Sequence, residues 1–115
     1  MITKKGQHRL FTEERSNGGK GSITLERILE DQEFSGNGKL FAKVTVSPGS
    51  SVGNHPHTDD IESYYILKGT ARYLDNGQEK ILHAGDVTYT PMGESHSIEN
   101  IGDEELEFIA LIVAG

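Results

Sequence analysis

The stretch of sequence that decides the fold runs from Gly49 to Gly69, GSSVGNHPHTDDIESYYILKG. His55 and His57 are two positions apart in it, so an extended backbone projects both imidazoles from the same face. Pro56 disfavours a helical conformation at His55, which keeps the pair extended. A short bend after His57 can return the chain so that Glu62 faces the same point. The stretch therefore predicts three ligands of one metal ion, carried on strands.

A second patterned stretch, Gly85 to Asn100, GDVTYTPMGESHSIEN, contains the candidate for a fourth ligand, His96. Three imidazoles and one carboxylate form a nitrogen and oxygen set that suits Mn, Fe, Co, Ni, Zn or Cu rather than Ca or Mg. The ligand types alone do not choose among these metals. Around an octahedral ion, four protein ligands would leave two adjacent positions that a small carboxylate, keto acid or diol could occupy.

Both stretches resemble the two sequence motifs of the cupin superfamily, with the spacings Gly49-x5-His55-x-His57-x4-Glu62-x6-Gly69 and Gly85-x5-Pro91-x-Gly93-x2-His96-x3-Asn100. The resemblance implies an all-β fold, a single-domain jelly-roll β-barrel, with a divalent metal inside it. The phrases LFAKVTVSPGSS and GESHSIEN are most similar to small bacterial cupins of the oxalate-decarboxylase-like group. This narrower resemblance implies Mn as the favoured metal and a small carboxylate or a sugar-derived compound as the ligand.

Length, charge and composition exclude several classes of protein. With 115 residues the chain has room for one domain, because a second core would leave each half too small. Its net charge of −7 argues against nucleic acid or an anionic membrane surface as a partner. The longest apolar run is far shorter than the roughly 20 residues of a membrane span, and no secretory signal is recognisable at the amino terminus. A cytoplasmic location is the expectation.

The pattern along the chain predicts eight or nine short strands. Residues 1–21 are polar and Gly-rich from Thr12 onward and are expected to form an N-terminal arm or loop, with a possible edge strand around Ile2 or Leu10. Residues 22–115 are expected to form the cupin domain. The segment from Ser22 to Glu30 fits a strand or a helix, and the surrounding pattern favours the strand.

Three further segments carry clear signals. Leu40 to Val46 alternates, with Leu40, Ala42, Val44 and Val46 on one face. Asp75-Asn76-Gly77-Gln78 predicts a hairpin, since Asn and Gly both tolerate positive φ. Leu106 to Val113 is nearly continuous in apolar residues, which predicts a central strand covered on both faces.

The walls of a substrate pocket can be inferred only from parity, that is, from which side chains alternate onto the same face of a strand. Tyr64 and Ile66 share the face of Glu62 if the strand is regular, and Phe41 and Lys43 lie on a face that could also point inside. These four residues are the predicted lining of the pocket.

Charged residues near the motifs have two interpretations. Lys43 or Arg72 could pair with a substrate carboxylate, although a lone buried cation is costly and surface positions explain both. Glu94, beside His96, and the pair Asp59 and Asp60, in the bend before Glu62, are candidate catalytic acids, although acidic residues in turns are usually solvated.

The sequence as a whole predicts a small metal-dependent cupin enzyme, a homodimer, acting on a small carboxylate in an oxalate-decarboxylase-like manner or on a sugar-derived substrate. One alternative is a metal-dependent module that binds or senses a small molecule without turnover. Another is a cupin dioxygenase or isomerase.

Overall fold

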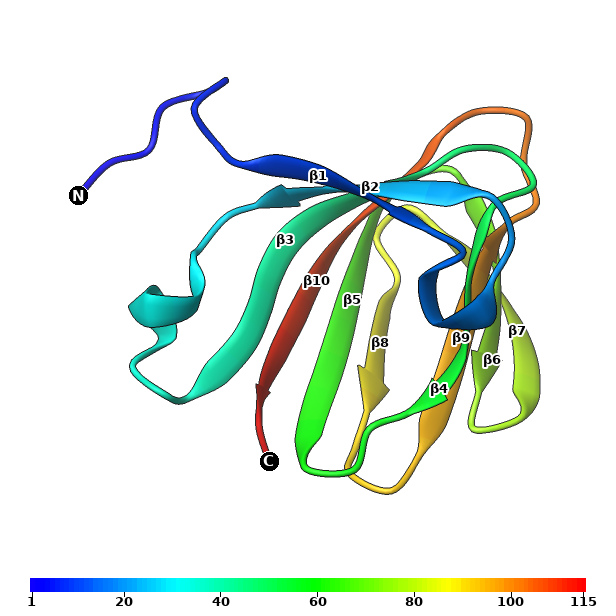
Figure 1. Ribbon diagram of the computed structural model, residues 1–115. Helices are drawn as coiled ribbons and strands as arrows, with labels where there is room; N and C mark the ends of the chain where they lie inside the picture. The colour runs from blue at the N-terminus through cyan, green and yellow to red at the C-terminus, as the bar shows by residue number, and fades with distance from the viewer.

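The computed structural model describes residues 1–115, and its strands form two antiparallel sheets that face each other (Figure 1). The six-stranded sheet has the order β1-β2-β3-β10-β5-β8, and the four-stranded sheet has the order β4-β9-β6-β7. The strands and the two short 3-10 helices, η1 and η2, are β1 Leu10–Glu14, η1 Ser16–Gly18, β2 Ser22–Arg27, η2 Asp31–Phe34, β3 Gly38–Val46, β4 Ser51–Pro56, β5 Asp60–Lys68, β6 Thr70–Asp75, β7 Gln78–His83, β8 Val87–Thr90, β9 Ser95–Asn100 and β10 Leu106–Ala114.

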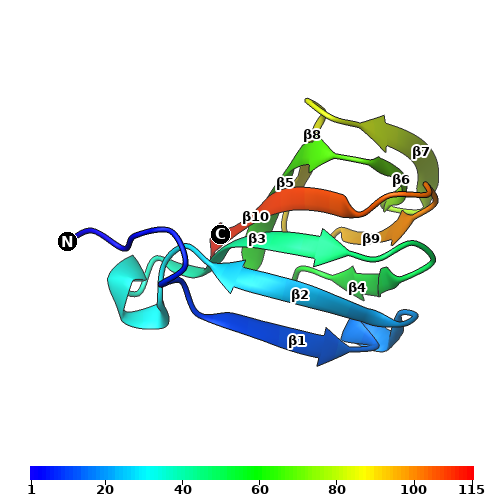
Figure 2. The same ribbon diagram turned by 90° about the horizontal axis from the view of Figure 1, so that it is seen from above.

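This arrangement is a jelly-roll sandwich, seen from above in Figure 2. The predicted all-β jelly-roll class is therefore confirmed, with one correction. The sheets do not close into a barrel, because β1 and β8 remain the edges of one sheet, and β4 and β7 the edges of the other. A bilayer-crossing helix is absent from the structure.

The hydrophobic core lies between the sheets, and the alternation in β3 shows how it forms. Ala42, Val44 and Val46 are buried, as predicted from the period of two. Val44 lies beside Phe108 of β10, which in turn lies beside Ile66 of β5, so three strands contribute one continuous row to the core. Each fully buried side chain of this size stabilises the fold by about 1.5–3 kcal/mol.

The segment with two possible interpretations forms a strand. Ile23 and Leu25 of β2 both point into the core, and the residues between and beside them are more exposed. A period of two is that of a strand, so the strand prediction for Ser22 onward is confirmed up to Arg27. The predicted hairpin is also confirmed: Asp75 pairs with Gln78, and Asn76 and Gly77 both have positive φ.

β10 occupies the predicted central position, between β3 and β5, but the prediction that both its faces are covered is wrong. Leu106, Phe108 and Ala110 face the core, whereas Leu111 on the other side is 36% exposed. The reason is that no further layer lies over this side of the six-stranded sheet in the single chain.

The possible edge strand around Leu10 is present in the N-terminal arm as β1. All five residues of β1 pair with β2, so the boundary expected at residue 21 separates two strands of the same sheet. After β1 the chain forms η1, which packs against β4 of the other sheet (Figure 1). This contact is close: a Cβ atom on Gly19 would collide with the backbone of Ser51 and Gly53. The arm thereby joins the two sheets at one end.

Candidate metal centre

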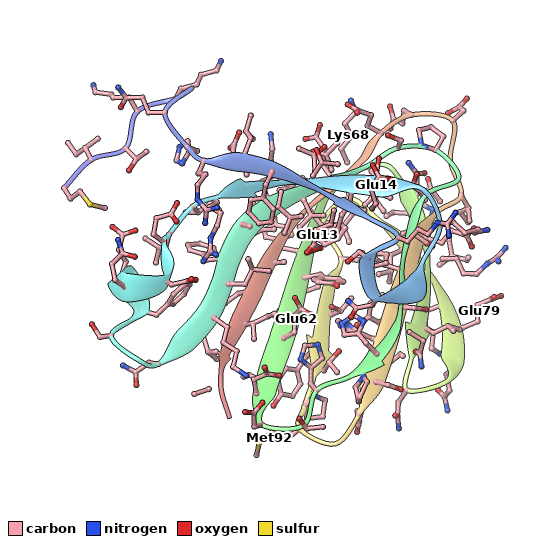
Figure 3. All side chains as sticks on the ribbon, in the orientation of Figure 1. Glu13, Glu14, Glu62, Lys68, Glu79 and Met92 are labelled. Atoms are coloured by element: carbon pink, nitrogen blue, oxygen red, sulfur yellow. The ribbon has the colours of Figure 1, made fainter.

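The four predicted ligands come from both sheets. His55 lies near the end of β4, His57 follows that strand directly, and His96 lies on β9, where it is the register partner of His55. Glu62 projects from β5 in the facing sheet (Figure 3). The turn that carries His57 is held by two backbone hydrogen bonds, from its N–H to the Glu94 carbonyl and from the Gly93 N–H to its own carbonyl. The cluster therefore lies between the two sheets.

The donor atoms of these residues converge. His96 Nε2 lies 3.1 Å from both His55 Nε2 and His57 Nε2. Glu62 Oε1 lies 2.9 Å from His96 Nε2, 3.0 Å from His57 Nε2 and 3.9 Å from His55 Nε2. One donor atom from each of the four residues lies within 4.8 Å of all the others.

The other ring nitrogens determine which tautomer two of the imidazoles adopt. His55 Nδ1 is 2.7 Å from the Gly53 carbonyl, and His57 Nδ1 is 2.6 Å from a carboxylate oxygen of Asp60. A carbonyl and an ionised carboxylate only accept hydrogen bonds, so both Nδ1 atoms carry the proton. In the neutral rings each Nε2 then presents its lone pair to the centre of the cluster, which is the state that a metal ligand requires.

The partners of the imidazoles are themselves held in place. Asp60 is buried and accepts a hydrogen bond from Lys39 at 2.8 Å in addition to that from His57. These two partners outweigh the effect of burial, which alone would raise its pKa, so the pKa of Asp60 is lowered.

On the opposite side of the cluster, His96 Nδ1 lies 2.7 Å from the Tyr73 hydroxyl and 3.0 Å from the Thr90 hydroxyl. His96 is completely buried, so these hydroxyls are its only polar partners on that side. Such contacts to the second nitrogen orient a ligating imidazole and tune its basicity.

The pKa values in the cluster follow from burial and from Glu62. Burial alone would raise the pKa of Glu62, but the three imidazoles, which donate to the carboxylate when they are protonated, outweigh burial and hold the pKa far below its usual range. The hydrogen bond to Glu62 raises the pKa of His57. Burial lowers the pKa of His96, although it also contacts Glu62. The two imidazoles differ because His96 is the more deeply buried and lacks a second carboxylate partner.

This donor set fits a transition-metal ion. Two ligands at about 2.1 Å from a cation and at right angles to each other have donor atoms about 3.0 Å apart. The four short separations here, 2.9–3.1 Å, match that value. Lone pairs and a carboxylate at such distances repel one another unless a proton or a cation lies between them. The cluster therefore has the chemistry and the spacing of a metal site.

A cavity of about 210 Å³ adjoins the cluster. His55 and Glu62 reach its surface, while His57 and His96 lie behind them and do not line it. The lining is formed by Phe11, Glu13, Ser16, Asn17, Ile23, Leu25, Leu40, Val44, Val52, His55, Glu62, Tyr64, Phe108, Ala110 and Ile112. A ligand in this cavity would reach the metal on its His55 and Glu62 side.

The predicted pocket residues are placed differently from one another. Tyr64 lines the cavity, as its shared parity with Glu62 suggested. Ile66 has the same parity but lies further along β5, fully buried in the core and outside the cavity. Phe41 and Lys43 do not line it either, because β3 turns their neighbours Leu40, Ala42 and Val44 inward; their prediction as lining residues needs correction.

The predicted acids and cations lie away from the cavity. Asp59 is exposed and pairs with Lys39, Glu94 contributes a backbone carbonyl to the turn at His57, and neither lines the cavity. Arg72 pairs on the surface with Glu79 and Glu99. None of these side chains therefore lines the cavity.

Sequence reasoning missed the contribution of the N-terminal arm. Phe11 and Glu13 of β1, with Ser16 and Asn17 of η1, close one side of the cavity. Figure 3 labels Glu13 on β1 and Glu62 on β5. A possible edge strand around Leu10 was expected, but the polar, Gly-rich composition of the arm did not indicate that Phe11 and Glu13, on one side of that strand, would reach the cavity.

Comparison with known proteins agrees with the jelly-roll fold and with the predicted family. Residues 42–112 match the model of the cupin domain family. An oxalate-binding protein of Thermotoga maritima is 46% identical over 96 residues, which is 84% of this chain and 79% of that protein. A crystal structure of a predicted oxalate decarboxylase from the same species, 39% identical, superposes over the full length of both chains with a TM-score of 0.95.

A more distant relative is much longer. The oxalate decarboxylase OxdC of Bacillus subtilis is 39% identical over 75 residues, 61% of this chain but only 20% of that enzyme. The match to this enzyme therefore concerns one part of it and not its whole architecture.

Proposed function

The chain belongs to the cupin domain family, and from that premise we propose that it is a metal-dependent protein that binds a small carboxylate. The convergence of three imidazole Nε2 atoms and the Glu62 carboxylate beside a cavity is the observation that carries the proposal. His55, His57, Glu62 and His96 would hold a divalent transition metal. Mn is the metal that the resemblance to oxalate-decarboxylase-like cupins favours, and Fe, Ni, Zn, Co and Cu also suit these ligands.

The metal ligands and the cavity walls would contribute to binding in different ways. A divalent metal supplies Lewis acidity, which polarises a carboxylate oxygen bound to it. Glu62 lowers the net charge of the site, and its depressed pKa keeps it ionised. The apolar walls exclude water from the side of the ligand that faces the core. They offer few donors to sugar hydroxyls, which favours the carboxylate over the sugar-derived substrate.

Turnover needs a further group that can give or take a proton. Only two residues that line the cavity outside the metal cluster have ionisable side chains, Glu13 and Tyr64. Burial raises the pKa of Tyr64 well above its usual value, so it stays protonated. Glu13, which accepts a hydrogen bond from the Ser16 hydroxyl at 3.0 Å, is therefore the acid or base that a decarboxylase-like activity would use.

One experiment tests both parts of the proposal. The purified protein is loaded with Mn, and carboxylate binding and CO₂ release are measured for the wild type, His96→Ala and Glu13→Gln. Loss of the metal and of binding in His96→Ala supports the metal-dependent role. CO₂ release by the wild type that disappears in Glu13→Gln, with binding retained, supports an enzyme. Saturable binding without any product supports the binding or sensing module, and failure of the wild type to bind a transition metal contradicts the proposal.

We also propose that two chains associate as a homodimer, and that the protein works in the cytoplasm on a small molecule. The dimer is supported by exposed apolar side chains on the outer side of the six-stranded sheet, among them Tyr65, Val87 and Tyr89.

A further inference from the structure

The cavity beside the metal cluster has an unusual charge distribution for a site that receives an acid. Ten of its fifteen lining residues are hydrophobic, and none is Lys or Arg. The apolar wall comes mainly from three adjacent strands, β2, β3 and β10, with Leu25, Leu40, Val44, Phe108 and Ile112. The charged side chains that reach the cavity are carboxylates, Glu13 and the metal-cluster residue Glu62.

The charge of a loaded site limits the charge of its ligand. A divalent cation, three neutral imidazoles and one ionised Glu62 have a net charge of about +1. One carboxylate on the ligand neutralises that charge. A second carboxylate leaves an excess negative charge that faces an apolar wall and Glu13, with no cation to pair with it. Burying an unpaired charge is costly, so a dianion is the poorer fit.

The size of the cavity limits the rest of the ligand. At about 210 Å³ it is smaller than the roughly 300–1,000 Å³ of pockets for drug-sized molecules. It therefore suits a small acid with a short aliphatic side chain, which would lie against Leu40, Val44 and Ile112 while the acid group meets the metal near Glu62. Ile112 is the register partner of both Glu62 and Leu40, so the apolar wall begins directly beside the metal ligand.

Building on the proposed function, we propose that this site is selective for monocarboxylates that carry a second oxygen on the adjacent carbon and an aliphatic side chain, as in aliphatic 2-oxo acids. Dicarboxylates such as oxalate are the weaker ligands. The adjacent carbonyl and carboxylate oxygens supply two donors to the metal, and the side chain takes the place of the second carboxylate.

The test compares acids of one series on the Mn-loaded full-length protein. Dissociation constants are measured by calorimetry for pyruvate, 2-oxobutanoate, 2-oxopentanoate, 4-methyl-2-oxopentanoate and oxalate. We expect affinity to rise about fourfold for each added methylene until the cavity is full. Oxalate should bind more weakly than the longer members. Chemical-shift changes of the Leu40 and Ile112 methyl groups on adding 4-methyl-2-oxopentanoate to the Zn-loaded protein, in which the metal is diamagnetic, give a second readout that needs no turnover.

Two neighbouring positions on β3 provide a matched pair of variants. Leu40→Lys places a cation on the cavity wall and should shift the preference toward oxalate by roughly tenfold. Phe41→Lys places the same charge on the opposite side of the strand, outside the cavity, and should leave the order of affinities unchanged whether or not it also separates the two chains of the proposed dimer.

The outcomes separate this inference from the function on which it rests. If oxalate binds more tightly than every 2-oxo acid, or if affinity does not change along the series, the selectivity is overturned and the carboxylate-binding function stands. If the Mn-loaded protein binds none of the acids, both are overturned. Equal effects of Leu40→Lys and Phe41→Lys would overturn the role assigned to the cavity wall.

Discussion

His57 has two carboxylate partners on opposite sides of its ring, and this makes metal binding sensitive to pH. Its Nε2 lies 3.0 Å from Glu62 and its Nδ1 lies 2.6 Å from Asp60. The hydrogen bond to Glu62 is the main reason why the pKa of His57 is raised, with Asp60 adding to it. A proton and a metal ion therefore compete for the same nitrogen atom at a higher pH than at an ordinary imidazole.

We predict that Mn affinity decreases as the pH is lowered, and that the decrease begins above the ordinary imidazole pKa of about 6.5. Protonation of His57 removes the lone pair that the metal needs, whereas Glu62 stays ionised because its pKa is strongly depressed. Calorimetric titration with Mn from about pH 8 to about pH 5 measures this. Affinity that is constant over that range, or that rises as the pH falls, would contradict the assignment of His57 as a ligand.

Asp60 and Asp59 differ in one contact, which makes them a test pair for the partner of His57. Both accept a hydrogen bond from Lys39, but only Asp60 also contacts the His57 ring. Asp59 is 77% exposed. We predict that Asp60→Asn weakens Mn binding by about 10- to 100-fold, because the amide is a poorer acceptor for the imidazole N–H.

Asp59→Asn is the control and should leave Mn affinity nearly unchanged. Competition with a chelator of known affinity measures both variants. If both weaken binding equally, the effect comes from Lys39 or from the net charge, and the orienting role of Asp60 is wrong.

At the scale of elements, the position of η1 against β4 shapes the cavity. Ser16 and Asn17 of η1 line it, and Gly19 follows directly at the point of closest approach to β4. The Ser51 hydroxyl accepts a hydrogen bond from the Lys20 N–H at 2.9 Å, which holds the arm in place. One side of the cavity therefore depends on a contact between two backbones.

We predict that Gly19→Ala destabilises the protein by about 1–3 kcal/mol, because the added methyl group has to push rigid backbone of β4 aside. Gly102→Ala is the control. A Cβ there has only ordinary contacts, at 3.6 Å and beyond, and Gly102 is not among the glycines with positive φ. Urea denaturation of both variants measures the difference. Equal stability of the two would show that η1 does not pack against β4 as described.

At the scale of the whole molecule, several exposed apolar side chains gather on the outer side of the six-stranded sheet. Two register rows cross β3, β10, β5 and β8 on this side: Phe41, Leu111, Ser63 and Tyr89 form one, and Lys43, Ile109, Tyr65 and Val87 form the other. Tyr65, Val87 and Tyr89 are each more than half exposed. An exposed apolar patch of this kind is typical of an interface, and two copies related by a twofold axis would cover each other.

We predict that the wild type has the mass of two chains in size-exclusion chromatography with light scattering, and that Tyr65→Lys has the mass of one. The lysine would bring like charges into a buried contact. Ile81→Lys is the control, since Ile81 is also exposed, at 48%, but lies on β7 of the other sheet. A monomeric wild type, or dissociation caused equally by both substitutions, would contradict this location of the interface.

Much of the molecule was predictable from local patterns in the sequence. The period of two identified β3 and the inward side of β2, and the Asn76-Gly77 pair identified the hairpin between β6 and β7. The spacing of His55 and His57 and the motif around His96 indicated the four residues that now lie together. Such signals work because strand periodicity and turn geometry depend on neighbours in sequence.

Tertiary structure alone decided the rest. Parity shows which residues share a side of a strand but not what that side contacts. It could therefore not show that Tyr64 reaches the cavity while Ile66 lies deeper in the core, or that Phe41 faces outward. Nor could it place Glu13 on the same cavity as Glu62, because β1 reaches the cavity only through its pairing with β2. These positions depend on contacts between segments far apart in the chain, and no local pattern of residues records such contacts.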